Sequence, residues 1–294
     1  MDRRGSAGLT LGELVFLVVV CALFLALLVP MLRRRRSTAF RPICGTNLCG
    51  IGKAMLIYAN DYEDRLPRAG GVAGCWSARI PDWTAMDQDA AFGVQRGSHQ
   101  GGRASVSASL YLLVKYAYLT PKSFLCDRDK GVTEFRPRLY RLRSRALDTL
   151  WDFGPDPPKH CSYAYHMVYS PHKPTVYGEP GFAIVADRNP WIDSPFAKAG
   201  RFAKFKPDIP PYGGTNDEVR CGNTVAHQQD GQNVLYLDAH VEFAKRPYCS
   251  VDDDNIYTSW NGQDKARGTP PVLGSQPADP NDSLLVNDPA VPRP

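Results

Sequence analysis

Two histidines and two carboxylates lie within the first 14 residues of HQQDGQNVLYLDAHVEF, residues 227 to 243. They are His227, Asp230, Asp238 and His240, and such side chains can bind a metal ion or exchange protons. No H-E-x-x-H sequence, nucleophile elbow or glycine-rich phosphate loop accompanies them. We therefore expect no enzyme activity. We expect His227 to organise a turn through hydrogen bonds and His240 to lie on a sheet face.

The same segment alternates as two strands of a hairpin would. With Asp238 and Ala239 as a two-residue turn, Tyr236 pairs with Val241 and Val234 with Phe243, so that the apolar side chains share one face. Alanine in place of the usual glycine requires either a left-handed residue, at a cost of about 1 kcal/mol, or a different turn.

A run of three acids, Asp252, Asp253 and Asp254, precedes Asn255 and offers the oxygen ligands that Ca²⁺ prefers. Such a run is also typical of a solvated turn or a helix cap. Asp187, at the end of the apolar run GFAIVAD, is a weaker candidate for the same ion. Calcium is the one cofactor that the sequence suggests.

The N-terminal region contains 24 residues, 9 to 32, whose only ionisable side chains are Glu13 and Cys21. At about 1.5 Å per residue, this helix can cross a hydrocarbon core of roughly 30 Å. A cleavable secretory signal would have a shorter apolar region and a small-x-small cleavage site after it, which is not found. We therefore predict a transmembrane helix.

The net charge of +5 comes from the flanks of this apolar run, in particular the leader and the arginine run 33–36. The rest of the chain sums to zero, so we expect membrane lipid as the neighbour of these arginines and no nucleic acid. Four arginines after the span against two before it would place the head in the cytoplasm by charge alone.

Beyond the span, the pattern predicts an α+β head with an antiparallel sheet. Pro42 marks a break or a first helical turn, and Ile51, Met55, Tyr58 and Tyr62 form the apolar stripe of a second helix. We expect a long irregular loop over 68–104, a helix over 108–119 and strands over 162–169 and 181–187. The predicted parts are a leader (1–8), a transmembrane helix (9–32), a helical stalk extension (33–62), a head (63–263) and a disordered tail rich in proline and aspartate (264–294).

Seven cysteines fall outside the span, and none forms a C-x-x-C pair. Disulfides in an oxidising compartment and buried free thiols are both compatible with this spacing. The pairing stays open.

The stretch GLTLGELVF, residues 8 to 16, followed by an apolar helix, resembles the class III processing signal of type IV prepilins and type II secretion pseudopilins. The resemblance implies that a prepilin peptidase cuts after Gly8 and methylates the new amine of Leu9. Pro30 also falls where many type IV pilins have a proline. Leader and peptidase would then be cytoplasmic and the head would be in the periplasm, contrary to the orientation that the arginines suggest.

The head resembles a pseudopilin-like family with a large C-terminal domain and an H-x9-DG motif. CGTNLCGIGKAM is similar to its C-x-x-N-L segment, FLCDRD to its F-x-C-P-S-D and residues 227–243 to its hairpin. Three features differ: ten residues separate His227 from Asp238, Ala239 replaces the glycine, and no proline follows Cys126.

Glu13 lies four residues after the expected new amine of Leu9. In a bundle of helices, its carboxylate can pair with the amine of a neighbouring subunit and offset the cost of two isolated charges. Alternatively, the carboxylate reaches the headgroups, since it lies only about 6 Å along the helix from its start.

The function implied is structural. The chain is expected to sit in the inner membrane as a single-pass protein and to assemble with other pilin or pseudopilin subunits through its N-terminal helix. The alternative is a membrane-anchored binding protein with a large head that does not polymerise.

Overall fold

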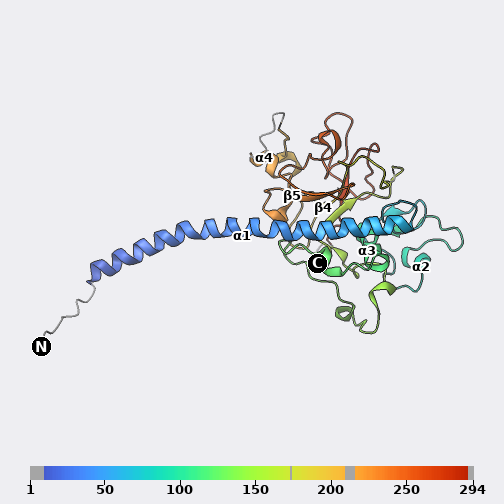
Figure 1. The fold of residues 1–294 in the computed structure, drawn as a ribbon, viewed down its shortest axis with the longest axis horizontal. Helices are drawn as coiled ribbons and strands as arrows, with labels where there is room; N and C mark the ends of the chain where they lie inside the picture. The colour runs from blue at the N-terminus through green and yellow to red at the C-terminus, as the bar shows by residue number, and fades with distance from the viewer. Residues whose placement is uncertain (1–9, 173, 209–215, 291–294) are drawn as a thin grey trace. The chain divides into compact units, whose positions relative to one another are not determined.

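The computed structural model describes residues 10–172, 174–208 and 216–290, except for the side chains of residues 29–40 (Figure 1). The chain divides into two compact units, residues 1–40 and 41–294. The helices are α1 (Leu11–Asp61), α2 (Gln88–Phe92), α3 (Val106–Tyr116) and α4 (Asp217–Arg220). The strands are β1 (Cys75–Trp76), β2 (Arg103–Ala104), β3 (Tyr163–His166), β4 (Ala183–Asp187), β5 (Gln232–Tyr236), β6 (Val241–Ala244) and β7 (Leu285–Val286). The 3₁₀ turns within the described residues are η1 (Pro121–Phe124), η2 (Pro137–Tyr140), η3 (Leu147–Thr149), η4 (Pro157–Lys159), η5 (Phe202–Lys204), η6 (Val225–His227) and η7 (Val251–Asp253).

The first unit contains the apolar part of α1. Its segment Leu11–Leu28 is long and apolar enough to span a membrane, as expected from the sequence, and none of its residues is buried. Gly8 and Leu9 lie outside the described residues, as do the side chains of the arginine run 33–36.

Helix α1 continues without interruption through Pro42, so the expected break there is wrong. A proline inside a helix costs about 3 kcal/mol. The packed face that begins at Cys44 offsets this cost, because Leu48 and Ile51 are fully buried with it and each buried apolar side chain contributes about 1.5–3 kcal/mol. Residues 41–61 therefore belong to the compact head unit and not to a separate stalk.

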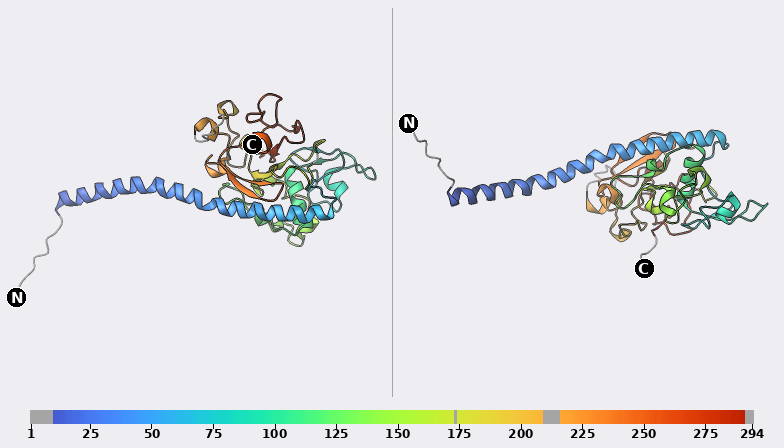
Figure 2. Two further views of the ribbon diagram at one scale, coloured as in Figure 1. Left: turned by 45° about the horizontal axis from the view of Figure 1, so that its top comes forward. Right: turned by 90° about the horizontal axis from the view of Figure 1, so that it is seen from below.

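The head part of α1 runs along the sheet (Figures 1 and 2). Ile51, Met55 and Tyr58 are buried as predicted, whereas Tyr62 follows the helix and stacks on Tyr58 with ring centroids 4.1 Å apart. Glycine brings the helix close to β5, since a Cβ on Gly52 would lie 2.8 Å from the side chain of Leu235.

The main sheet has five strands in the order β6-β5-β4-β3-β7, and all neighbours are antiparallel. This agrees with the expected α+β head and antiparallel sheet. The alternation of side chains along each strand divides the core in two. Tyr163 and Tyr165 of β3 join the larger core with α1 and α3. Ala164 joins a second core on the opposite face, with Tyr248 and Tyr257 from the C-terminal loops.

The β5–β6 hairpin has a different register from the expected one. Leu235 pairs with Val241 and Val234 with Glu242, so the loop has three residues, 237–239, in place of two. Ala239 is left-handed, with φ of 67°. A three-residue loop with a left-handed last position is the common alternative to a two-residue turn, and it shifts the pairing by one residue.

The expected disordered tail, 264–294, is ordered in its described part. Strand β7 pairs with β3 at the edge of the main sheet, and Leu284, Leu285 and Val286 are fully buried. Asp288 accepts hydrogen bonds from the first backbone N–H groups of α3, at 3.0 Å from Val106 and 2.8 Å from Ser107. A short apolar run therefore closes the fold inside a segment rich in proline and aspartate.

Candidate metal centre

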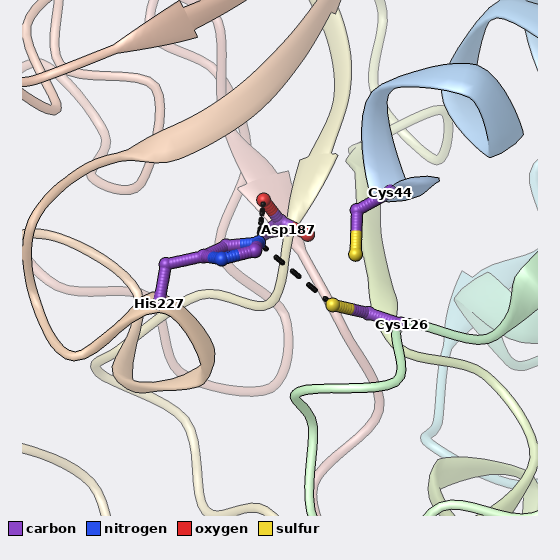
Figure 3. Close-up of side chains that lie close together, drawn as sticks. All are labelled: Cys44, Cys126, Asp187 and His227. Atoms are coloured by element: carbon purple, nitrogen blue, oxygen red, sulfur yellow. Dashed lines mark hydrogen bonds and ion pairs between the residues drawn. The ribbon is translucent and has the colours of Figure 1, made fainter. Parts of the chain in front are cut away.

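Four buried side chains from distant parts of the chain meet beside the sheet (Figure 3). Cys44 lies at the start of the head part of α1, and Cys126 follows η1. Asp187 is the last residue of β4, and His227 is the last residue of η6. All four side chains have at most 2% of their surface exposed.

The loop between η6 and β5 sets the position of His227. Gln228 and Gln229 both adopt left-handed backbone conformations, with φ of 59°. Gly231 follows with φ of 145°, and a Cβ at this position would lie 2.3 Å from the carbonyl oxygen of Ala244. Only glycine fits such a conformation so close to a neighbouring strand. The chain therefore reverses sharply and turns the imidazole inward.

The donor atoms of the cluster are close enough for a shared ligand. His227 Nε2 lies 3.1 Å from Asp187 Oδ2 and 3.8 Å from Cys126 Sγ. One ligand atom from each of the four residues, Cys44 included, lies within 4.8 Å of all the others. Figure 3 shows the side chains converging on one space.

Asn233 on β5 fixes the carboxylate. Its backbone N–H and its Nδ2 donate to Asp187 Oδ2 at 2.7 and 2.9 Å. The Tyr257 hydroxyl donates to the backbone carbonyl of Asp187 at 2.6 Å, and Phe243 meets the His227 ring edge-on. Asn233 Nδ2 also lies 3.2 Å from His227 Nε2, so Asn233 contacts both Asp187 and His227.

Two atoms of the cluster, Asp187 Oδ1 and His227 Nδ1, are buried and find no hydrogen-bond partner within the described part of the chain. A buried polar group without a partner costs about 1–3 kcal/mol. Protein atoms alone therefore do not satisfy the cluster.

The environment shifts the pKa of two of the four groups. The hydrogen bond with Cys44, together with burial, raises the pKa of the Cys126 thiol well above its usual range. Burial alone would lower the pKa of His227, but hydrogen bonds and charge interactions with Asp187 and Cys126 outweigh it and raise the pKa to about 10. Without another cation, His227 is therefore protonated at neutral pH and pairs with the carboxylate.

The geometry argues against a Cys-His-Asp catalytic triad. In a triad, the nucleophile and the carboxylate contact different nitrogens of the imidazole ring. Here Cys126 and Asp187 both face Nε2, and Nδ1 has no partner among the described residues. The complete burial of His227 also leaves a substrate no access. A metal ion, a Cys44–Cys126 disulfide and a hydrogen-bonded cluster are the arrangements that fit.

The other residues of the histidine-rich segment do not join the cluster. Asp238 lies in the hairpin loop and accepts hydrogen bonds from the backbone and the ring Nδ1 of His240. The His240 ring is half exposed and stacks on Tyr236. Asp230 forms ion pairs with Arg41 at 3.0 Å and Arg220 at 2.8 Å. The expectation that His227 organises a turn is wrong for its side chain, which points into the cluster.

The three acids proposed for calcium are not gathered. Asp252 pairs with Lys265 at 3.3 Å, while Asp254 is buried and accepts the N–H of Ser283 at 2.7 Å. Among the described residues, Asp252, Asp253 and Asp254 form no group of ligand atoms close enough to hold an ion. The geometry gives the calcium prediction no support.

The sequence contained a signal for part of the cluster. Cys44, Cys126 and His227 each stand in one of the three segments that carry the resemblance to the H-x9-DG family. Their proximity in the fold could not be derived from spacing, because Cys126 lies 82 residues after Cys44 and His227 lies 101 residues after Cys126. Asp187 was considered only for calcium.

Comparisons with known proteins returned nothing: no family description, no curated protein and no solved structure matches the chain.

Proposed function

We propose that the chain is a pseudopilin-like subunit, anchored in the inner membrane by the first part of α1 and assembled through this helix into a pilus-like filament or secretion pseudopilus. The observation that carries the proposal is α1 itself, a helix of 51 residues. Its first part is apolar and exposed, and its last part packs within an α+β head. An exposed apolar helix requires lipid or other helices around it.

Glu13 has a local partner that the sequence reasoning missed. Its Oε2 accepts hydrogen bonds from the backbone N–H and the hydroxyl of Thr10, both at 2.9 Å, and the Glu13 N–H lies 3.4 Å from Thr10 Oγ1. This is a capping box, in which two side chains satisfy backbone donors at the start of a helix. In the proposal, Glu13 has this role and also faces the amine of Leu9 in a neighbouring subunit.

Two substitutions separate these roles. Glu13→Gln keeps an oxygen that can accept from Thr10 but removes the charge, because glutamine also serves in capping boxes. Thr10→Val removes the hydroxyl and keeps the charge. We expect Glu13→Gln to lose assembly as fully as Glu13→Ala, since an unpaired charge in a helix core costs about 2.5–3.5 kcal/mol. Thr10→Val should assemble, with helix stability lowered by about 1 kcal/mol.

The measurement is the amount of cross-linked, sedimentable oligomer from membranes of cells that contain a prepilin peptidase. Mass spectrometry of the N-terminal peptide serves as the control, because each variant must be cut after Gly8 and methylated on Leu9. Wild-type assembly by Glu13→Gln would overturn charge pairing. An intact leader on all of the wild-type protein would overturn the proposal as a whole.

A cavity in the head favours the second function, a membrane-anchored binding protein that does not polymerise. It has a volume of about 430 Å³ and is lined by Arg68, Trp76, Tyr169 and Gln276, among others. Cavities of this size are typical of small-molecule sites. Wild-type protein that remains monomeric in the membrane after processing would favour this function over assembly.

A further inference from the structure

We propose that Cys44, Cys126, Asp187 and His227 bind a Zn²⁺ ion, which ties α1 to the sheet of the head. Thiolate sulfur, imidazole nitrogen and carboxylate oxygen are the three kinds of ligand that zinc uses in proteins. Four of them in one buried cluster complete its tetrahedral shell. This inference concerns the head alone and does not depend on assembly of the subunit.

The distances agree with the edges of a zinc tetrahedron. Zinc bonds of about 2.3 Å to sulfur and 2.0–2.2 Å to nitrogen and oxygen place nitrogen about 3.4 Å from oxygen and about 3.6 Å from sulfur. The His227 Nε2 atom lies 3.1 Å from Asp187 Oδ2 and 3.8 Å from Cys126 Sγ. Cys44 Sγ, within 4.8 Å of the other three ligand atoms, needs only a small side-chain shift to close the shell.

The contacts around Asp187 also suit a metal ligand. Carboxylates that bind zinc are commonly held by hydrogen bonds from the surrounding protein. Asn233 provides two such bonds to Oδ2 and leaves Oδ1 without a partner among the described residues. An ion at the centre would be bound through Oδ2, which lies 3.1 Å from His227 Nε2, and it would replace the protons of the two thiols and of the imidazolium.

The site is structural in character. Catalytic zinc keeps a position open for water or substrate, whereas a site with four protein ligands is closed. The ligands come from α1, the loop after η1, β4 and η6, and the first and last of them are 183 residues apart in the chain. The ion would therefore cross-link four segments around the point where α1 joins the sheet.

Zinc content and a cobalt spectrum of the full chain test the proposal. The protein is purified in detergent, passed over a chelating resin, and its zinc is measured by mass spectrometry. We expect a single zinc ion per chain in the wild type and its loss in Cys126→Ser and in His227→Ala. The matched controls Cys161→Ser and His166→Ala, which change a buried cysteine and a buried histidine outside the cluster, should keep the ion.

A second measurement needs no variant, so it remains decisive if a substitution prevents folding. After removal of zinc by a strong chelator, Co²⁺ is added to the wild-type protein. Thiolate-to-cobalt charge-transfer absorption with intense visible bands would support a tetrahedral site with sulfur ligands, and added Zn²⁺ should abolish it. Release of the ion should also lower the Tm.

Two results would overturn the proposal. One is protein from native membranes that contains no zinc and a Cys44–Cys126 disulfide in a non-reducing peptide map. The other is a zinc content that is the same in His227→Ala as in His166→Ala.

Discussion

The buried carboxyl of Asp152 makes the stability of the head depend on pH. Asp152 is fully buried beside the N-terminus of α3, where it accepts hydrogen bonds from the Ser105 hydroxyl and from the N–H of Phe153. Burial, and next the charge of Asp288, raises the pKa of Asp152 from 3.8 to about 7. The folded protein therefore holds a proton that the unfolded chain releases above about pH 4.

The sign of the effect follows from the direction of the shift. Between about pH 4 and pH 7, unfolding releases this proton, so the free energy of unfolding falls as the pH rises. A shift of about three pKa units corresponds to about 4 kcal/mol, which is fully lost above pH 7. Asp152→Asn imitates the protonated acid and cannot ionise. We expect the variant to match the wild type near pH 4 and to be more stable by about 4 kcal/mol near pH 8.

The assay is urea unfolding of the full chain in a nonionic detergent, followed by tryptophan fluorescence because Trp151 is adjacent to Asp152. Other shifted groups, such as Asp254 with its pKa raised to about 8, titrate in both proteins and cancel in the difference. Asp217→Asn is the matched control, since the side chain of Asp217 is fully exposed. A stability difference for Asp152→Asn that stays constant from pH 4 to pH 8 would refute the reasoning.

Two further predictions concern the backbone at the two ends of β5, and urea midpoints at one pH measure both. Ala239→Gly should stabilise the head by about 1 kcal/mol, because Ala239 is left-handed and glycine adopts this conformation without a steric penalty. An unchanged or lower urea midpoint would contradict this stabilisation. Gly231→Ala should destabilise the head by about 3 kcal/mol or more, because the new Cβ would overlap the carbonyl oxygen of Ala244. A midpoint like that of the wild type would show that the loop relaxes freely.

The local pattern of apolar residues predicted individual helices and strands better than it predicted which strands pair and in which register. The stripe of Ile51, Met55 and Tyr58 and the strands near 163–166 and 183–187 follow from periodicity, which depends only on neighbouring residues. The hairpin register failed because it depends on one backbone angle, at Ala239, that selects a three-residue loop. Strand β7 was not predicted, because the average composition of the 31 residues 264–294 concealed a short apolar run.

The candidate site also depends on contacts between distant parts of the chain, which local sequence patterns do not predict. His227 was singled out with Asp238 and His240 because they are close in sequence, yet the hairpin places Asp238 in its loop and His240 directly after it, both half exposed. The His227 ring contacts Asn233 of the same segment, but its partners in the cluster are Cys126 and Asp187, from other parts of the chain. Nothing in local spacing reports such contacts, because they depend on how η1, β4 and η6 meet around the sheet.

The position of the cluster indicates what a bound zinc ion would do for the head part of α1. Helix α1 enters the compact head unit at Arg41, and Cys44 is its first buried residue there. Apolar contacts are weak against sliding because they are not directional, whereas metal bonds fix an atom in direction and distance. A zinc ion at Cys44 would therefore hold the helix in register with β4 and η6. Chelation should loosen this end of α1 before it affects α3, and amide hydrogen exchange can resolve the two.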